Sequence, residues 1–177
     1  MTSTDQRPLL FLDVDGPLIP FGGTPQQYPD GYPTYRPSHP AAGPQAAAAN
    51  PLLTRIDPAH GPRLAALGYE LVWATTWMAD ANECIAPWLG LPELPVVPWP
   101  EDSAEDEQKG LHGKTRALVD RAAGRAFAWV DDEITEADRT WVEEHHAGRS
   151  LLHHVDPRHG LTEADYAALT RWRAADG

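Results

Sequence analysis

The sequence predicts an α/β domain in three layers, with a mostly parallel sheet between two layers of helices. Five short apolar runs, several rich in β-branched or aromatic residues, alternate with segments of helical period. Two of these runs end in closely spaced aspartates, at the position where open α/β sheets bind their ligands. Both observations favour strands that are joined by crossover helices and that carry a site at one edge of the sheet.

The alternation fixes where each element is expected. Runs of strand character occupy residues 9–13, 69–75, 95–99, 126–131 and 151–155. Apolar residues at helical spacing predict helices at residues 62–67, 79–89, 114–123, 134–146 and 163–174. Thr135 with Asp138, and Thr162 with Asp165, fit the looser form of the capping box, which marks the start of a helix.

Residues 16–51 differ from the rest, because proline, glycine, tyrosine and alanine dominate and no period is sustained. This composition predicts a long loop, or flap, directly after the first strand. Possible substrate contacts in and near it are Tyr28, Tyr32, Tyr35, Arg36, His39 and His60. Packing of the loop, or capping in the case of His60, is the commoner role for such residues. A chain of 177 residues suits one domain, so we expect a single domain over residues 1–177 with this flap.

Charge and cysteine content narrow the classes of partner. The formal net charge of −12 opposes attraction to nucleic-acid phosphates and to anionic membranes. Cys84 is the only cysteine, which excludes an internal disulfide and a zinc site built on several thiolates. The first residues lack the apolar region of a signal peptide, and no stretch approaches the length of a membrane span. We therefore expect a cytoplasmic protein that binds neither membranes nor nucleic acid.

Two acidic motifs carry the chemistry. The segment FLDVDGPL places Asp13, Asp15 and Gly16 at the end of one predicted strand, and AFAWVDD places Asp131 and Asp132 at the end of another. Four carboxylates at one sheet edge would repel one another unless a cation compensated them. Oxygen ligands in this number suit Mg²⁺. The sequence therefore predicts a magnesium site at Asp13, Asp15 and the 131–132 pair, with either member of that pair as the direct ligand.

Four motifs in chain order resemble the haloacid dehalogenase superfamily. They are Asp13-Val14-Asp15-Gly16, Thr75 after ELVWA, Lys114, and Asp131-Asp132. The resemblance extends from about residue 9 to residue 155 and implies a Rossmann-like sheet whose first and fourth strands are neighbours. With short crossovers we expect the order fifth, fourth, first, second, third. The intervals between the motifs hold no large cap domain, so the chain resembles a minimal-cap phosphatase member.

The resemblance implies roles for individual residues. Asp13 would be the nucleophile that forms an aspartyl-phosphate, and Asp15 would protonate the leaving oxygen and then activate water. Asp15 would reach the metal through its main-chain carbonyl, which leaves its side chain free for proton transfer. Thr75 would hydrogen-bond the transferring phosphoryl group, and Lys114 would neutralise its charge.

Some of these assignments have competitors in the sequence. Thr76 is the alternative hydroxyl to Thr75, and Lys109 is the less favoured substitute for Lys114. We count Thr76 and Gly16 as candidate substrate contacts.

The expected function is therefore magnesium-dependent hydrolysis of a phosphate monoester. An aspartate at position 15 favours this reaction over cleavage of carbon–halogen or carbon–phosphorus bonds, because members that cleave those bonds characteristically lack it. The expected substrate is a phosphorylated small molecule or a phosphoprotein, and the oligomeric state is left open. The alternative is a phosphate-binding or regulatory module that acts on a protein partner and has little catalytic activity.

Overall fold

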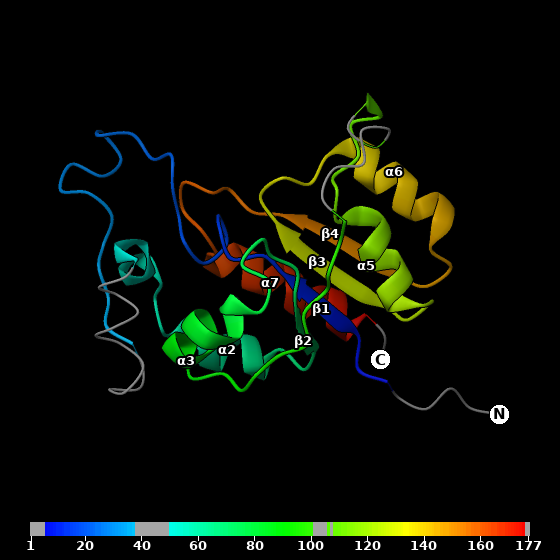
Figure 1. Ribbon diagram of the computed structural model, residues 1–177, viewed down its shortest axis with the longest axis horizontal. Helices are drawn as coiled ribbons and strands as arrows, with labels where there is room; N and C mark the ends of the chain where they lie inside the picture. Colours follow the sequence, from blue (N-terminus) through cyan, green and yellow to red (C-terminus); the bar gives the residue numbers. More distant parts are fainter. Residues whose placement is uncertain (1–5, 38–49, 101–105, 107, 176–177) are drawn as a thin grey trace.

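The computed structural model describes residues 6–37, 50–100, 106 and 108–175. Its four strands are all parallel and lie in the order β2-β1-β3-β4 (Figure 1). They are β1 (Leu9–Leu12), β2 (Glu70–Trp73), β3 (Phe127–Asp131) and β4 (Ser150–His154). Because β1 lies between β2 and β3, the residues that follow it stand at the middle of the sheet edge. This α/β arrangement is consistent with the expected Rossmann-like fold.

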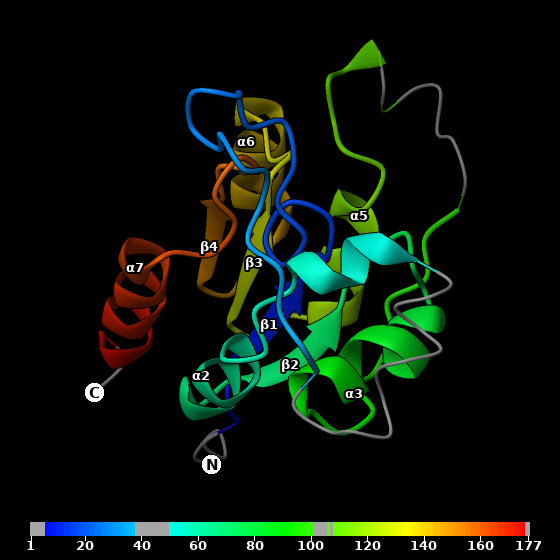
Figure 2. The ribbon, with the colours of Figure 1, turned by 90° about the vertical axis from the view of Figure 1, so that its left-hand side faces the viewer.

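Helices cover both faces of the sheet, as Figures 1 and 2 show from two directions. One face packs against α5 (Thr115–Ala122) and α6 (Glu136–His145). The opposite face packs against α2 (His60–Ala66), α3 (Ala86–Leu89) and α7 (Glu163–Ala174). The prediction of three layers is therefore confirmed for the described residues.

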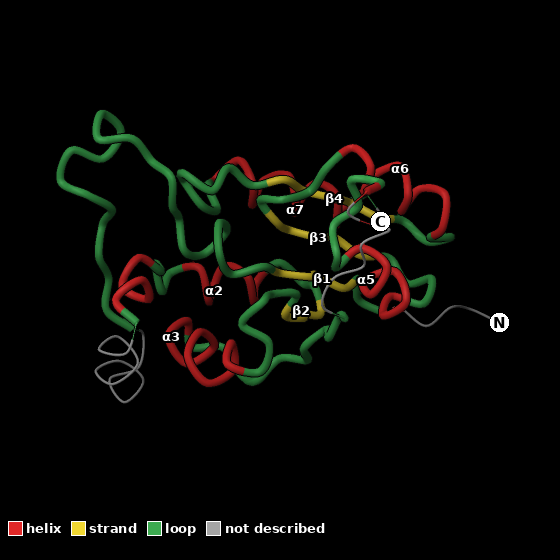
Figure 3. Tube along the Cα trace, turned by 45° about the horizontal axis from the view of Figure 1, so that its top comes forward, coloured by secondary structure: helices red, strands yellow, loops and turns green. Residues whose placement is uncertain are grey.

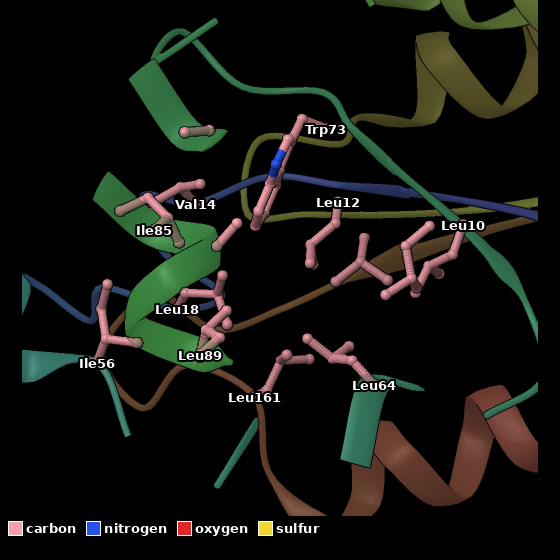
Figure 4. Packing of buried hydrophobic residues seen from close by; sticks show 14 of the residues in the cluster. Leu10, Leu12, Val14, Leu18, Ile56, Leu64, Trp73, Ile85, Leu89 and Leu161 are labelled. Carbon is pink, nitrogen blue, oxygen red and sulfur yellow. The ribbon is translucent and has the colours of Figure 1, made fainter. Parts of the chain in front are cut away.

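The side chains of β1 alternate between the two cores. Leu9 and Phe11 pack on the side of α5 and α6, whereas Leu10 and Leu12 pack on the side of α2, α3 and α7. Figure 4 shows this second cluster, in which Leu10 and Leu12 meet residues of the helices and loops. By the same alternation, the side chain that follows Leu12 points toward the α5 side. The residue at that position is Asp13.

The predicted strand at residues 95–99 is wrong. In the described residues it contributes one isolated bridge, between Trp73 and Val96. Pro95 and Pro98 explain the failure, since proline has no N–H to donate to a strand ladder. The five-stranded sheet and its full order are therefore not confirmed.

The predicted helix at residues 79–89 is also altered. The chain there forms a single wide turn, η3 (Ala81–Ile85), which runs directly into the short helix α3. Pro87 removes one backbone donor from this segment, which disfavours a regular helix through it. The predicted helix at residues 134–146 begins two residues late, at Glu136, because Thr135 is its N-cap. Both predicted capping boxes are confirmed.

The flap is irregular between residues 16 and 37, as expected (Figure 3). It returns through a 3₁₀ turn, η2 (Pro51–Arg55), which the sequence did not predict. Residues 38–49 of the predicted flap lie outside the described residues. No helix within the described ranges has both the length and the apolar character that crossing a membrane requires.

Candidate active site

The site forms where β1, β2 and β3 end together. Leu12 pairs with Val130 on β3 and with Trp73 on β2, so the residues after them stand at one level of the sheet. Asp13 and Asp131 both continue the alternation toward α5, and Lys114 is the N-cap residue of that helix. The Lys114 Nζ lies 2.7 Å from Asp131 Oδ2 and 3.2 Å from Asp13 Oδ1. The structure thus brings three of the predicted site residues into direct contact.

This cluster is almost fully removed from solvent. Lys114 is 2% exposed, Asp131 0% and Asp13 5%. Burial raises the pKa of Asp13 above its ordinary value, and the charge of Asp131 adds to this effect while Lys114 opposes it. Burial alone would lower the pKa of Lys114, but the two carboxylates raise it. Two buried carboxylates therefore share one ammonium group, and when both are ionised one negative charge has no compensating partner among them.

Asp132 adds a third carboxylate to the cluster. One oxygen from each of Asp13, Asp131 and Asp132 lies within 4.8 Å of the others. Burial raises the pKa of Asp132 to about 6, and the neighbouring charge of Asp131 contributes. A donor set of carboxylate oxygens is the kind that Mg²⁺ prefers, and a divalent cation would relieve the repulsion among them. The residues present therefore fit the predicted metal.

The two members of the acidic pair differ in how their oxygens are engaged. Asp131 Oδ2 accepts hydrogen bonds from Lys114 Nζ and Trp129 Nε1, and Asp131 Oδ1 accepts one from the Glu133 main-chain N–H. The half-buried Asp132 instead lies against the turn at Gly16. A second group of possible ligands, His112 with Asp131 and Glu133, shares Asp131. Its imidazole suits transition metals better than Mg²⁺.

Gly16 allows the close approach of Asp132. Its φ of +98° belongs to a region that side chains disfavour. A Cβ added there would lie 2.6 Å from Asp132 Cγ, so any other residue would displace that carboxylate. The structure therefore gives Gly16 a role in forming the site, and its predicted contact with substrate stays a prediction.

The two candidate threonines occupy different environments. Thr75 is fully buried just after β2, and its hydroxyl accepts a hydrogen bond from the Trp77 main-chain N–H at 3.2 Å. Thr76 is exposed. The main-chain N–H of Ala74 bonds to the Leu12 carbonyl, which places Thr75 next to the turn that carries Asp13. Position therefore favours Thr75 as the hydroxyl of the site.

Two further residues hold the site together, and sequence reasoning missed both roles. Trp77 Nε1 donates a hydrogen bond to Asp15 Oδ2 at 3.1 Å. Asp138, predicted only as a capping residue, is fully buried and accepts from His112 N and Thr115 Oγ1 at 2.8 and 2.6 Å. It thereby ties the start of α6 to the start of α5, where Lys114 lies. The sequence signal for Asp138 was its place in a capping box, whereas the contact of Trp77 with Asp15 spans 62 positions and has no local pattern.

The remaining candidates are the second lysine and residues of the flap. Lys109 is exposed, so Lys114 is the lysine that meets the acids. Tyr28, Tyr32 and Tyr35 lie in the described part of the flap. His39 lies outside the described residues.

The geometry agrees with comparisons to known proteins. A family described as "HAD domain in Swiss Army Knife RNA repair proteins" matches residues 9–166, which include every predicted site residue. A search of curated proteins and a search of solved structures each give no match. Most of the chain is covered by this family match, and it ends beyond the last strand of the sheet. The chain therefore belongs to the haloacid dehalogenase superfamily of hydrolases, in the family of domains found in Swiss Army Knife RNA repair proteins.

Proposed function

We propose that the protein is a magnesium-dependent phosphohydrolase that cleaves a phosphate monoester through an aspartyl-phosphate on Asp13. The observation that carries this proposal is the buried contact of Lys114 with both Asp13 and Asp131, beside a third carboxylate from Asp132. Burying such a cluster costs free energy unless its charges are compensated. A divalent cation would compensate the carboxylates, and an anionic substrate would interact with the cation and with Lys114.

The proposed reaction uses the chain's residues in two steps. A carboxylate oxygen of Asp13 attacks phosphorus, the bond from phosphorus to the ester oxygen breaks, and Asp15 gives its proton to the departing alcohol. Asp15 then accepts a proton from water as the water attacks the aspartyl-phosphate, which releases inorganic phosphate and restores both aspartates. Lys114 and the Thr75 hydroxyl stabilise the charge of the transferring group.

Asp13, Asp132 and the main-chain carbonyl of Asp15 are the proposed ligands of Mg²⁺, with Asp131 beside them. When bound, the ion supplies positive charge that keeps Asp13 ionised and polarises a phosphoryl oxygen. The hydrogen bonds on both oxygens of Asp131 support the assignment of Asp132 as the direct ligand of the pair.

The substrate class is proposed from two facts that point in different directions. The family description names RNA repair proteins, whereas the net charge of −12 opposes binding along a phosphate backbone. A monoester at the end of an RNA strand satisfies both, because only the terminal nucleotide needs to enter the site. Phosphorylated metabolites and phosphopeptides are the competing substrates.

The first test is release of phosphate from 4-nitrophenyl phosphate, with Mg²⁺ and after its removal by a chelator. We expect turnover that requires Mg²⁺ and that falls by at least about 10³-fold in Asp13→Asn, because the nucleophile is lost. Asp120→Asn, at an exposed aspartate of α5, is the matched control and should retain activity.

Circular dichroism should show that both variants keep their fold. Appreciable activity in Asp13→Asn would contradict the mechanism. Inactivity of the unaltered protein toward RNA ends, phosphorylated metabolites and phosphopeptides would instead favour the regulatory, phosphate-binding alternative.

A further inference from the structure

A cavity lies on the far side of the turn that carries Asp15 and Gly16, and none of the acids of the candidate active site lines it. Its volume is about 340 Å³, within the range of small-molecule sites. The flap, the segment from η2 into α2 and the loop between β4 and α7 form its walls. Figures 1 and 2 both show these three segments together on the side where β1 ends.

One wall of this cavity continues directly from the catalytic turn. Pro17 and Leu18 line it, and they follow Asp15 and Gly16 in the chain. Consecutive Cα atoms are about 3.8 Å apart, so the Cα of Pro17 lies within roughly 8 Å of the Cα of Asp15. The Pro17 carbonyl accepts a hydrogen bond from Leu161 N at 2.9 Å, which joins this wall to the loop before α7. The wall of the cavity and the turn that carries Asp15 are thus consecutive parts of the chain.

The charges that line the cavity are equal in number, and two of them form an ion pair. Arg63 forms a salt bridge with Glu163 at 2.7 Å, and its guanidinium also lies 3.8 Å from the ring centre of Tyr166. Burial lowers the pKa of His60, which keeps its ring neutral near pH 7. The lining holds two arginines, Arg55 and Arg63, and two acids, Asp57 and Glu163, so its formal charges balance. This balance suits an uncharged polar ligand better than a second phosphate.

Three tyrosine rings, those of Tyr28, Tyr32 and Tyr35, also line the cavity. Tyr28 and Tyr32 stack with ring centres 4.2 Å apart, and Arg55 covers Tyr32 at 4.5 Å. Tyr35 also lines the cavity and is 36% exposed. Among the described residues, no aromatic or cationic group covers the Tyr35 ring. Part of the Tyr35 side chain is therefore open to solvent within the cavity.

We propose that this cavity binds the nucleoside of a nucleoside phosphate whose phosphate lies at the Asp13 cluster, with the base stacked on Tyr35. The proposal rests on the proposed phosphohydrolase function and names its substrate class. An uncharged ribose and a planar base match the balanced charges and the aromatic wall, and bases stack on tyrosine with little dependence on sequence. The nucleotide could be free or at the end of an RNA strand, since both present the same chemistry to the cavity.

The test compares substrates that share the phosphate and differ in the base. Values of kcat/KM are measured for ribose 5-phosphate, for AMP and UMP, and for a hexaribonucleotide with a 5′- or a 3′-terminal phosphate. We expect the nucleotides to exceed ribose 5-phosphate by roughly tenfold, the size of one stacking contact. Preference for the hexamers over AMP and UMP would identify an RNA end, and the reverse preference a free nucleotide.

Variants at the exposed ring assign the effect to the cavity. Tyr35→Ala should remove most of the roughly tenfold preference for the nucleotides over ribose 5-phosphate, and Tyr35→Phe should retain the preference. Phe21→Ala is the matched control, because Phe21 is another exposed flap aromatic, at 43%, and does not line the cavity. A base preference that survives in Tyr35→Ala would overturn the proposal.

A binding measurement separates this proposal from the proposed function. Calorimetry with adenosine and uridine, which carry no phosphate, should detect binding to the unaltered protein and weaker binding to Tyr35→Ala. Phosphatase activity without nucleoside binding or base preference would overturn the nucleoside cavity alone. Nucleoside binding without hydrolysis of any ester would overturn the phosphohydrolase function and leave the cavity supported.

Discussion

Trp77 holds the residue on which the proposed proton transfers depend. Its indole N–H donates to Asp15 Oδ2 across 62 positions of sequence, so one carboxylate oxygen already has a partner. In the proposed reaction the other oxygen would meet the leaving group. Trp77 would then be a positioning residue, which acts on the ester through Asp15.

We predict that Trp77→Phe lowers kcat by roughly tenfold for an alkyl phosphate and by much less for 4-nitrophenyl phosphate. Nitrophenolate leaves without much help from an acid, whereas an alkoxide needs the proton of Asp15. Steady-state kinetics with both esters measure the ratio. Trp172→Phe, in α7, is the control and should leave the ratio unchanged. Equal losses for the two esters would show that Trp77 has only a structural effect.

At the residue scale, the sequence predicted which acids meet but not which threonine and tryptophan lie near them. Asp13 and Asp131 could be predicted to meet because each follows an apolar run, and parallel strands bring such ends together. The choice between Thr75 and Thr76 could not be made from the sequence. Neighbouring side chains at a strand end point in different directions, and the sequence does not show which of them faces the acids. The contact with Trp77 depends on the turn after β2, where Met78 adopts a φ of +48°.

Two helices are joined at their starts by one buried carboxylate. Asp138 completes the capping box of α6 and also accepts from Thr115 Oγ1 and from His112 N, next to Lys114. Asp165 completes the equivalent capping box of α7, where its other partner is His153 at 2.7 Å. The two aspartates thus have the same local role, but only Asp138 also secures the lysine of the site.

This pair offers a matched prediction. Asp138→Ala should lower the free energy of unfolding by about 2–4 kcal/mol, because several buried donors lose a charged acceptor, and should lower kcat by about tenfold or more. Asp165→Ala should cost about 1–2 kcal/mol with little change in kcat. Urea denaturation and turnover of 4-nitrophenyl phosphate measure both effects. Equal changes of kcat in the two variants would contradict the link from Asp138 to Lys114.

At the scale of elements, periodicity located the helices better than the third strand. The capping boxes at Thr135 and Thr162 are local, so the sequence alone identified them. The run at residues 95–99 has strand-like residues, but Pro95 and Pro98 limit it to a single bridge beside Trp73. The apolar residues between these prolines led to the prediction of a strand, although each proline removes one backbone donor.

The net charge of the whole molecule opposes contact with the phosphate backbone of any RNA substrate. With a net charge of −12, the protein has little to offer a phosphate backbone beyond the terminal nucleotide. We predict that log(kcat/KM) for a 5′-phosphorylated hexaribonucleotide falls with log[KCl] at a slope shallower than about −2 when Mg²⁺ is fixed. Single strands give about −0.7 per phosphate contact.

The measurement needs kinetics at four or more salt concentrations, with AMP as the reference substrate. A slope of about −4 or steeper would mean contacts to roughly six phosphates. That result would contradict recognition of the strand end alone.

The sequence by itself determined the α/β class, the capping boxes of α6 and α7, and the acids that meet at the sheet edge. These features depend on short segments, because a strand pattern or a helix cap is complete within a few residues. Tertiary structure decided which lysine meets the acids, which threonine is buried near them, which groups Trp77 and Asp138 contact, and where a cavity forms. Each of these depends on side chains far apart in the chain, whose distances are fixed only when the helices pack on the sheet.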